Sequence, residues 1–559
     1  MSSDQPQPAT QTGPPTGNGQ EKPTLTGRAF YTSLGSPRLV VAPMVDRSEF
    51  AWRMLTRSFM PGADGTDKHG RPVLAYSPMF HARLFRETEG YRAQHFEAVR
   101  RVDGNGEEKE VPYLDGNPSM DRPLIVQFCA NDPADLLDAA RRVQGYCDAV
   151  DLNLGCPQGI AKRGHYGAFL QEDWGLIWRL IRTLRDGLDV PVTAKFRIQE
   201  SKEKTLEYAR MILDAGASVI TVHGRRREQK GHNTGLADWA YIRYLREKLP
   251  ADTVIFANGN VLNHADVQRC LEETGADAVM SAEGNLSDPT IFAGPPDPKL
   301  LETDDGRRMY WVGRDGRGGY RMDFVLRRYL DIIHEYVLEQ GKPVRPPLYI
   351  PGDPPRAPPE PEQKPQGDTE HPDEPPKKKL KRSKTRQKYN KPTSPNLTVI
   401  QGHLFQLLRP LISHHTYIRD ALARSKAGDI PAFENVLSMV ERVVEEGIRY
   451  YEDPESEEAR AFDQMEMDGD GLSEVEKTRR RVRRPWWVCQ PYVRPAPEEA
   501  AGKGALREKK DKSKEKEKEK DRKEMKDDGC ADGCAESGKE NVEPEPESEA
   551  KDAGVEKAG

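Results

Sequence analysis

The chain has 559 residues, of which 36% are hydrophobic and 45 are proline, so part of it is predicted to stay outside any packed core. Its formal net charge of -6 is small and gives no reason to expect a strongly acidic or basic partner for the whole chain. Seven scattered cysteines and the lack of an apolar run of roughly 18 residues argue against a disulfide framework and a membrane span, so we expect a soluble protein in a reducing, intracellular compartment.

Three stretches are predicted to be disordered because they are rich in Pro, Gln, Thr, Gly or charge and lack a hydrophobic period. They are residues 1–30, an insertion at residues 350–395, and most of residues 453–559. The insertion contains the basic run KKKLKRSKTRQK, whose composition fits a nuclear import signal and fits an RNA contact equally well. We therefore expect the protein in the cytoplasm, the nucleus or both.

Short apolar, β-branched runs alternate with segments of helical spacing between the first two of these stretches. The runs are LVVAPMV (39–45), LAYSPMF (74–80), LIVQFCA (124–130), AVDLNLG (149–155), PVTAKFR (191–197), VITVHGR (219–225), TVIFANGN (253–260) and AVMSAEGN (278–285). Repeated strand and helix units favour a parallel sheet, and eight of them predict an α/β fold, a (β/α)₈ TIM barrel over residues 36–295.

Helical spacing returns after the barrel, at residues 315–345 and 396–452. We interpret these ranges as one helical domain that the insertion interrupts. A Trp-rich segment, RPWWVCQPYVRP, follows at residues 484–495 and is a candidate to dock back on the folded domains.

Polar residues collect late in the predicted strands or just after them. They are Gln127, Asn153, Cys156, Lys195, Arg197, His223, Asn258 and Glu283. TIM barrels carry their reactive groups at this end of the strands, so the pattern predicts one shared site.

Cys156 stands between Gly155 and Pro157, directly after a predicted strand. A free thiol has a pKa near about 8.5, so it is mostly protonated at neutral pH and able to donate a proton. A cysteine after a strand is more often an inert buried residue, but the flanking glycine and proline remove this one from strand geometry.

The other strand-end groups suit a phosphorylated planar cofactor. Lys195 offers a cation, His223 a donor or general acid, and Gln127 an amide that pairs with a heterocycle. The Gly-containing turns ANGN and SAEG present backbone N–H groups where barrels frequently bind phosphate. Singly, each residue fits a structural role about equally well, and their joint placement favours flavin mononucleotide (FMN).

These motifs resemble the tRNA-dihydrouridine synthase family from about Arg38 to Leu286. They are APM, QF, DLNLGCPQGIAKRGHYGAFL, VTAKFRI, TVHGRRREQK, ANGN and SAEG. The longer strings are most similar to the eukaryotic, fungal branch that acts on uridines 16 and 17 in the D-loop of tRNA. The resemblance implies reduction of uridine to 5,6-dihydrouridine with FMN and NADPH or NADH, and it makes Cys156 the proton donor to C5.

The resemblance also implies a set of cofactor-binding residues. They are Pro43, Met44 and Val45 at the flavin edge, Gln127 at its pyrimidine ring, Lys195 near N1 and O2, His223, and the backbones of Asn258, Gly259, Asn260, Ala282 and Glu283 at the phosphate. No metal site is expected.

Access to a uracil inside folded tRNA requires the base to be flipped out of its stack, so the remaining RNA needs a second surface. The helical domain is the predicted surface. We expect RNA contacts from Asn153, Arg197, Arg225 and Arg419, with Arg327, Arg328, His414, His415, Arg424 and Lys426 as further candidates, although basic residues on helices more often form only a solvated face. We expect a monomer.

Two other functions remain open at this stage. One is an FMN-dependent pyrimidine reductase of the dihydroorotate-dehydrogenase type, which would need no helical RNA-binding domain. The other is an RNA-binding scaffold that has lost catalysis and would purify without flavin colour.

Overall fold

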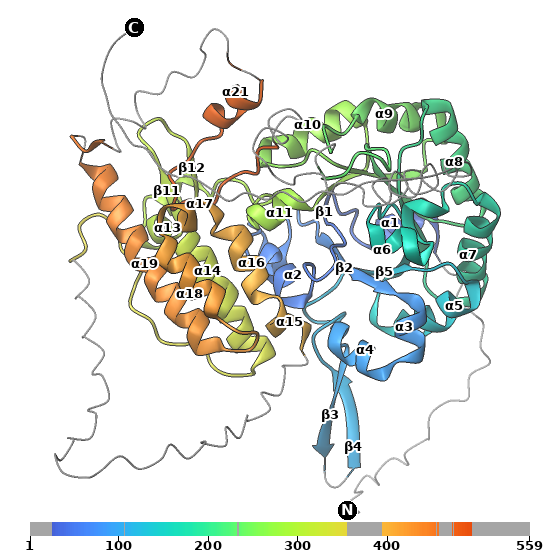
Figure 1. Ribbon diagram of the computed structural model, residues 1–559, viewed down its shortest axis with the longest axis horizontal. Helices are drawn as coiled ribbons and strands as arrows, with labels where there is room; N and C mark the ends of the chain where they lie inside the picture. Colours follow the sequence, from blue (N-terminus) through green and yellow to red (C-terminus); the bar gives the residue numbers. More distant parts are fainter. Residues whose placement is uncertain are drawn as a thin grey trace, which may run out of the picture. The chain divides into compact units, whose positions relative to one another are not determined.

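The structure is a computed structural model that describes residues 25–104, 107–231, 234–354, 394–453, 455–457, 472 and 474–494 (Figure 1). Most of the three stretches predicted to be disordered lies outside these ranges, as do the basic run and the last two cysteines. No helix within the described ranges is both long and apolar enough to cross a bilayer.

Eight parallel strands close into a barrel in the order β1-β10-β9-β8-β7-β6-β5-β2 (Figure 1). Their bounds are β1 Leu39–Val41, β2 Val73–His81, β5 Leu124–Cys129, β6 Ala149–Leu154, β7 Val192–Arg197, β8 Val219–His223, β9 Val254–Asn258 and β10 Ala278–Ser281. Each strand falls within one of the eight predicted runs or overlaps most of it. The predicted TIM barrel is therefore confirmed.

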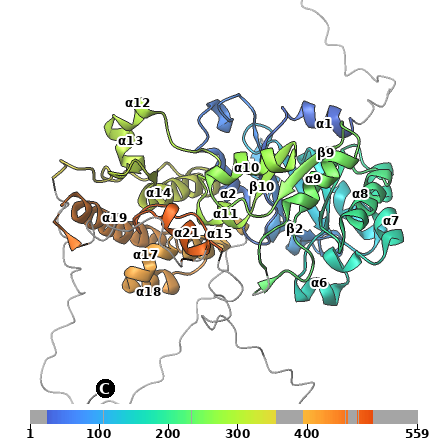
Figure 2. The ribbon, with the colours of Figure 1, turned by 90° about the horizontal axis from the view of Figure 1, so that it is seen from above.

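Helices surround the barrel and bury one face each against it (Figure 2). The longer ones are α5 Pro133–Arg141, α7 Trp174–Gly187, α8 Lys202–Asp214, α9 Trp239–Lys248 and α10 His264–Thr274. Each begins after an Asp, Ser or Asn whose side chain accepts a hydrogen bond from a backbone N–H of the first turn, which stabilises the helix start by about 1 kcal/mol.

Two hydrophobic layers fill the barrel region. Side chains such as Val40, Tyr76 and Phe256 pack inside the barrel, and a larger layer packs between the strands and the surrounding helices. Burial of one such large apolar side chain contributes roughly 1.5–3 kcal/mol, so these layers hold the strand ends in fixed register.

Shorter elements connect the barrel units. They are α1 Gly27–Ser33, η1 Ala63–Gly65, α3 Ala82–Glu87, α4 Glu89–His95, β3 Val99–Gly104, β4 Glu107–Pro112, η2 Gln144–Tyr146, α6 Gly159–Gly164, η3 Gly167–Leu170, α11 Glu283–Ser287, α12 Pro298–Leu301, α13 Asp304–Met309, β11 Tyr310–Val312 and β12 Gly318–Tyr320. The hairpins β3–β4 and β11–β12 were not predicted from the sequence.

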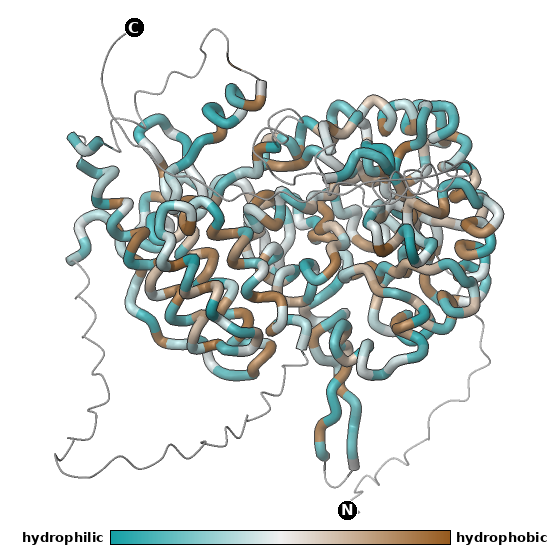
Figure 3. Tube along the Cα trace, viewed as in Figure 1, coloured by the Kyte–Doolittle hydropathy of each residue, from teal (hydrophilic) through white to brown (hydrophobic). Residues whose placement is uncertain are grey.

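A helical domain follows the barrel, with hydrophobic and hydrophilic residues alternating along its helices (Figure 3). Its elements are α14 Met322–Ile332, the π-helix η5 Ile333–Val337, α15 Pro395–Thr398, α16 Ile400–Leu407, α17 Arg409–His414, α18 Thr416–Arg424 and α19 Ile430–Glu452. Helix α2, Phe50–Arg57, comes from the first barrel loop and packs into the same core. There Trp52 stacks on His403 at 4.0 Å between ring centroids, and its Nε1 donates to Asn285 Oδ1 at 2.8 Å.

Helix α21, Glu474–Arg481, precedes residues 482–494, which we call the Trp segment. Its Trp487, Val488 and Cys489 are buried in the core of the helical domain. Backbone hydrogen bonds join Met322 N to Trp487 O at 2.9 Å and Cys489 N to Tyr320 O at 2.9 Å. The sequence made this segment, within a mostly disordered tail, a candidate to dock back on the folded domains, and it packs on the helical domain.

Gly447→Ala in α19 is expected to lower the thermal unfolding midpoint. A Cβ added there would lie 2.6 Å from Trp487 Cε3, and such overpacking costs about 1–3 kcal/mol. Gly175→Ala in α7 is the matched control, because its added Cβ would have no neighbour closer than 3.6 Å and alanine favours helices. A midpoint that rises in both variants would show that the Trp segment does not press on α19.

Candidate functional site

The polar strand-end residues meet at one end of the barrel, which we call the barrel mouth: the C-terminal ends of β5 to β10 and the residues directly after them. The register pairs Asn153 with Lys195, Arg197 with His223, and His223 with Asn258. Parallel strands with this register present these side chains side by side. The site predicted from the sequence is thus a continuous row of residues in space.

A turn fixed by side-chain hydrogen bonds holds Cys156 at the barrel mouth. Asn153 Oδ1 accepts hydrogen bonds from the backbone N–H groups of Gly155 and Cys156, at 3.0 and 2.9 Å. Arg197 Nε donates to Gly155 O at 2.8 Å from the neighbouring strand. The thiol is partly exposed, and it influences the pKa of both Lys195 and Arg197, so the three groups lie within electrostatic range.

A second loop closes over this turn. Gly167 has a φ of +66°, and a Cβ there would lie 2.8 Å from Cys156 O, so only glycine fits without a shift. Ala168 N donates to Cys156 O at 3.1 Å. Tyr166 is buried beside Cys129 and packs in one cluster with Cys156. The loop therefore fixes the cysteine backbone.

A buried polar network lies beneath the cysteine turn. Gln127 donates from Nε2 to Asp151 Oδ2 at 2.7 Å and accepts from Asn153 Nδ2 at 2.8 Å. Thr193 Oγ1 donates to Asp151 Oδ1 at 2.6 Å. Burial raises the pKa of Asp151 to about 6, although these hydrogen bonds and Lys195 oppose the shift. The network orients both Gln127 and the asparagine that builds the turn.

Ionisation of Asp151 is expected to lower the free energy of unfolding as pH rises from about 4 to about 6. Its pKa is raised from 3.8 to about 6 in the folded protein, so the unfolded chain releases the proton first. At 1.36 kcal/mol per unit, this contribution to the free energy of unfolding falls by about 3 kcal/mol and is constant above that range. Urea titrations of the wild type and Asp151→Asn across this range test it. If the free energy of unfolding changed with pH in the same way in the wild type and in Asp151→Asn, the assignment to Asp151 would be wrong.

The cations of the mouth are buried and close together. Lys195 Nζ donates to Asn258 Oδ1 at 3.0 Å, and burial together with Arg197 lowers the lysine pKa to about 8. Burial and the neighbouring cations hold the pKa of His223 well below its ordinary value, so the imidazole is neutral at pH 7. Arg225 Nη1 lies 2.9 Å from His223 Nε2, and because arginine only donates, the imidazole proton resides on Nδ1.

Arg225 organises the neighbouring turns. It is 3% exposed, and most of its N–H groups donate to protein acceptors: the carbonyls of Thr234 and Gly235, and Asn260 Oδ1 at 2.7 Å. Burial and nearby arginines lower its pKa to about 9. Contacts of this kind position the loop, and the side chain has little capacity left for RNA.

The two Gly-containing turns line a cavity of about 250 Å³ together with His223 and Arg225. Gly259 has a φ of +107°, and a Cβ there would lie 3.0 Å from His223 Cδ2. Asn260 adopts a φ of +61° and is held through its side chain by Ala237 and Arg225. Asn258, Ala282 and Glu283 complete the wall, so the predicted phosphate-binding residues surround one space.

These residues fit FMN. Within the described residues, Asn258 is the only hydrogen-bond acceptor of the buried Lys195 ammonium, which leaves donors for a carbonyl or an anionic ring. Pro43, Met44 and Val45 follow β1, and Met44 packs in one cluster with Ala282. In the part of the chain that the structure describes, no group of three or more His, Cys, Asp or Glu side chains could hold a metal ion.

The predicted RNA contacts of the helical domain lie elsewhere. Arg419 on α18 is exposed at 53% of its side chain. Arg327 pairs with Glu441, which occupies its guanidinium. His415 lies 4.6 Å from Trp486 between ring centroids, so it packs on the Trp segment.

Two residues of the mouth were missed from the sequence. Asp151 lies two residues before Asn153 on one strand and so faces the same side, a signal that the period of two already contains. Arg494 of the Trp segment forms an ion pair with Glu283, and no sequence signal links residues that far apart.

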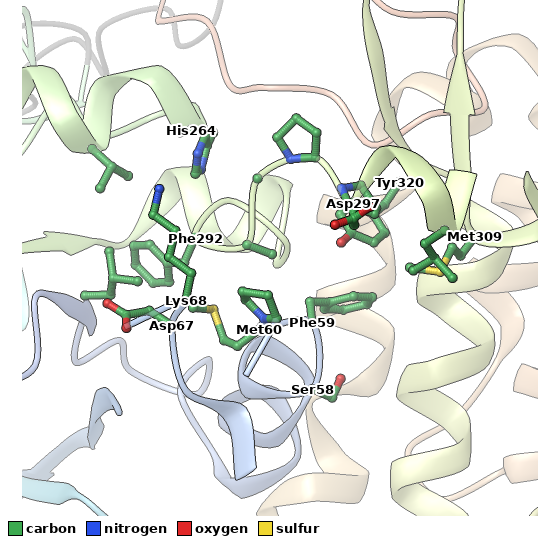
Figure 4. Close-up of a pocket in the computed structure, with 18 of the residues that line it drawn as sticks. Ser58, Phe59, Met60, Asp67, Lys68, His264, Phe292, Asp297, Met309 and Tyr320 are labelled. Carbon is green, nitrogen blue, oxygen red and sulfur yellow. The ribbon is translucent and has the colours of Figure 1, made fainter. Parts of the chain in front are cut away.

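A much larger cavity, of about 1150 Å³, lies away from the mouth (Figure 4). Met60, Lys68, His264 and Phe292 line it, with Arg38 at the N-terminal end of β1. None of the predicted strand-end residues contributes, and barrels place catalysis at the opposite end. Cavity size alone would therefore have pointed to the wrong place.

Comparison with known proteins agrees with this geometry. The family model described as dihydrouridine synthase (Dus) matches residues 40–342. The tRNA-dihydrouridine(16/17) synthase of Saccharomyces cerevisiae is 40% identical over 494 residues, 88% of this chain and 91% of that protein. The Schizosaccharomyces pombe protein of the same name is 40% identical over 472 residues, 84% and 91% of the two chains. The chain belongs to the dihydrouridine synthase family.

Proposed function

We propose that this chain reduces uridine to 5,6-dihydrouridine at positions 16 and 17 of tRNA, with FMN as cofactor and NADPH or NADH as reductant. The observation that carries the proposal is Cys156, whose backbone turn Asn153 and Arg197 hold at the barrel mouth, with the thiol within electrostatic range of Lys195. The two fungal relatives carry this activity, and the use of NAD(P)+, in their names.

FMN would supply the hydride that adds to C6 of the uracil. Cys156 would donate its thiol proton to C5, so that the C5–C6 double bond becomes a single bond and two hydrogens are added in all. The thiol is suited to this because its backbone is fixed by the turn while its side chain is partly exposed. A proton taken from solvent would restore it.

The remaining residues of the mouth would bind and orient. Lys195 would place its free donors against the flavin ring, and Gln127, oriented by Asp151, would face the pyrimidine edge. Neutral His223 would donate from Nδ1. The turns at residues 258–260 and 282–283 would receive the phosphate, as the cavity between them permits.

The tRNA would extend from the mouth onto the helical domain. Arg419 is exposed there, and phosphate contacts of such residues would be lost progressively with added salt. Asn153 and Arg197 would act on the substrate through the Cys156 turn that they hold. The flipped uracil would then meet the thiol directly.

Incubation of the purified protein with unmodified tRNA and NADPH, followed by mapping of dihydrouridine by position, tests the proposal. Product at positions 16 and 17 is expected. Product at other positions would overturn the site assignment. Turnover of free dihydroorotate or orotate would favour the pyrimidine reductase, and purified protein without flavin absorbance would favour the inactive scaffold.

A further inference from the structure

The Trp segment reaches from the helical domain to the barrel mouth. Val488 forms a β-bridge with Arg321, next to α14, which anchors its middle. Arg484 Nη1 donates to Asp288 Oδ2 at 3.3 Å, just beyond α11 of the barrel, and to Cys489 O at 2.7 Å. The segment, drawn in red in Figure 1, therefore continues beside α11, where Arg494 is held.

Arg494 is a largely buried arginine beside the barrel mouth. Its side chain is 9% exposed and pairs with Glu283 Oε2. Its Nε is buried and has no hydrogen-bond partner among the described residues. The guanidinium also lies close enough to His223 and Arg225 to lower the pKa of each. A buried donor without an acceptor is costly, so an acceptor atom of a ligand at this point would be stabilising.

The charges around it identify the class of ligand. Lys195, Arg197, Arg225 and Arg494 converge on His223, and burial lowers the pKa of all four. Among the described residues that line the cavity between the two turns, Glu283 is the only one with a carboxylate. An excess of buried positive charge of this kind is relieved by an anion.

Glu283 presents a specific difficulty at this position. Its backbone is part of the turn that would receive the cofactor phosphate, and its carboxylate would repel a phosphate dianion. Arg494 pairs with that carboxylate and retains further donors, including the unpartnered Nε. One side chain can thus neutralise the repulsion and bind the anion.

We propose that Arg494, brought to the barrel mouth by the Trp segment, binds the phosphate of FMN and completes the cofactor site from outside the barrel. The proposal rests on the proposed function, because it requires FMN at this mouth. A phosphate of the tRNA backbone has the same chemistry and is the other possible source, so the test separates the two.

The test compares FMN with riboflavin, which lacks the phosphate, on full-length Arg494→Ala, Arg494→Lys and wild-type protein stripped of flavin. Quenching of flavin fluorescence gives each Kd. Arg494→Ala is expected to raise the Kd for FMN about tenfold or more and to change the Kd for riboflavin by no more than about twofold. Arg494→Lys should give a Kd for FMN between those of the wild type and Arg494→Ala. Arg243→Ala, which removes an exposed arginine paired with Glu247 on α9, is the control and should change neither.

Each other outcome overturns the proposal. Equal losses for FMN and riboflavin would make Arg494 a structural residue of the mouth. Unchanged FMN binding with a higher Kd for tRNA in filter binding would assign it to an RNA phosphate. Wild-type protein that binds neither flavin would overturn the proposed function as well, whereas normal wild-type FMN binding with an unaffected variant would overturn this inference alone.

A double-mutant cycle with Glu283→Gln adds a second readout. The amide removes the repulsion while the backbone turn stays, so Glu283→Gln should recover part of the FMN affinity that Arg494→Ala loses. Additive effects of the two changes would show that Arg494 and Glu283 do not act on the same phosphate.

Discussion

Cys156→Ala is expected to lower the rate of dihydrouridine formation by about 10²- to 10⁴-fold while FMN and tRNA still bind, since that range is typical for loss of a positioned general acid. The turn should survive the change, because Asn153 binds the backbone N–H groups of Gly155 and Cys156 and not the thiol. Rapid mixing of the reduced holoenzyme with tRNA, with dihydrouridine measured in a single turnover, isolates the chemical step.

Two variants sharpen this experiment. Cys156→Ser keeps a hydroxyl of similar size that is a much weaker acid, so it should also be slow. Cys129→Ser changes the neighbouring buried cysteine, whose pKa burial raises to about 12, and should retain most of the activity. A full rate in Cys156→Ala, or an equal loss in Cys129→Ser, would remove Cys156 as the proton donor.

The barrel could be predicted because its strands carry a strong local signal. Parallel strands covered on both faces read as nearly continuous apolar runs, as Ala149–Leu154 does with every residue buried. The hairpin β3–β4 has no such signal, since its strands, VRRVDG and EEKEVP, are dominated by charge.

The site was predictable wherever strand order alone sets the geometry. Arg197, His223 and Asn258 end successive strands, and the register of the closed barrel places them side by side. The contact between Arg494 and Glu283 depends instead on how the Trp segment crosses the helical domain. The packing of Trp487 and Val488 in that core, together with the hydrogen bonds of the segment to Tyr320 and Asp288, sets this path, and no spacing in the sequence encodes it.

Asp121→Asn is expected to lower the free energy of unfolding by about 3–5 kcal/mol, as is typical when a buried ion pair loses one partner. Asp121 is fully buried and accepts from Arg53 Nε at 3.0 Å, Arg57 Nη1 at 2.6 Å and Gly116 N at 2.9 Å. The amide would leave Asp115 as the remaining carboxylate partner of Arg53 and would remove the carboxylate that pairs with the buried Arg57. Urea unfolding at pH 7 measures the loss.

The effect should reach the function, because α2 carries Trp52 into the core shared with the helical domain. Burial by itself would raise the pKa of Asp121, but Arg53 and Arg57 hold it below its ordinary value of 3.8. The stabilisation is therefore present above about pH 4 and is lost as pH falls through the pKa of Asp121 in the folded protein. The difference in free energy of unfolding between the wild type and Asp121→Asn should therefore become smaller at acid pH. Asp186→Asn, at an exposed pair with Arg182, should change stability too little to resolve. Asp121→Asn could instead leave the free energy of unfolding unchanged at pH 7, or lower it by the same amount at every pH down to the acid range. Either result would show that the charge of Asp121 does not hold α2 in place.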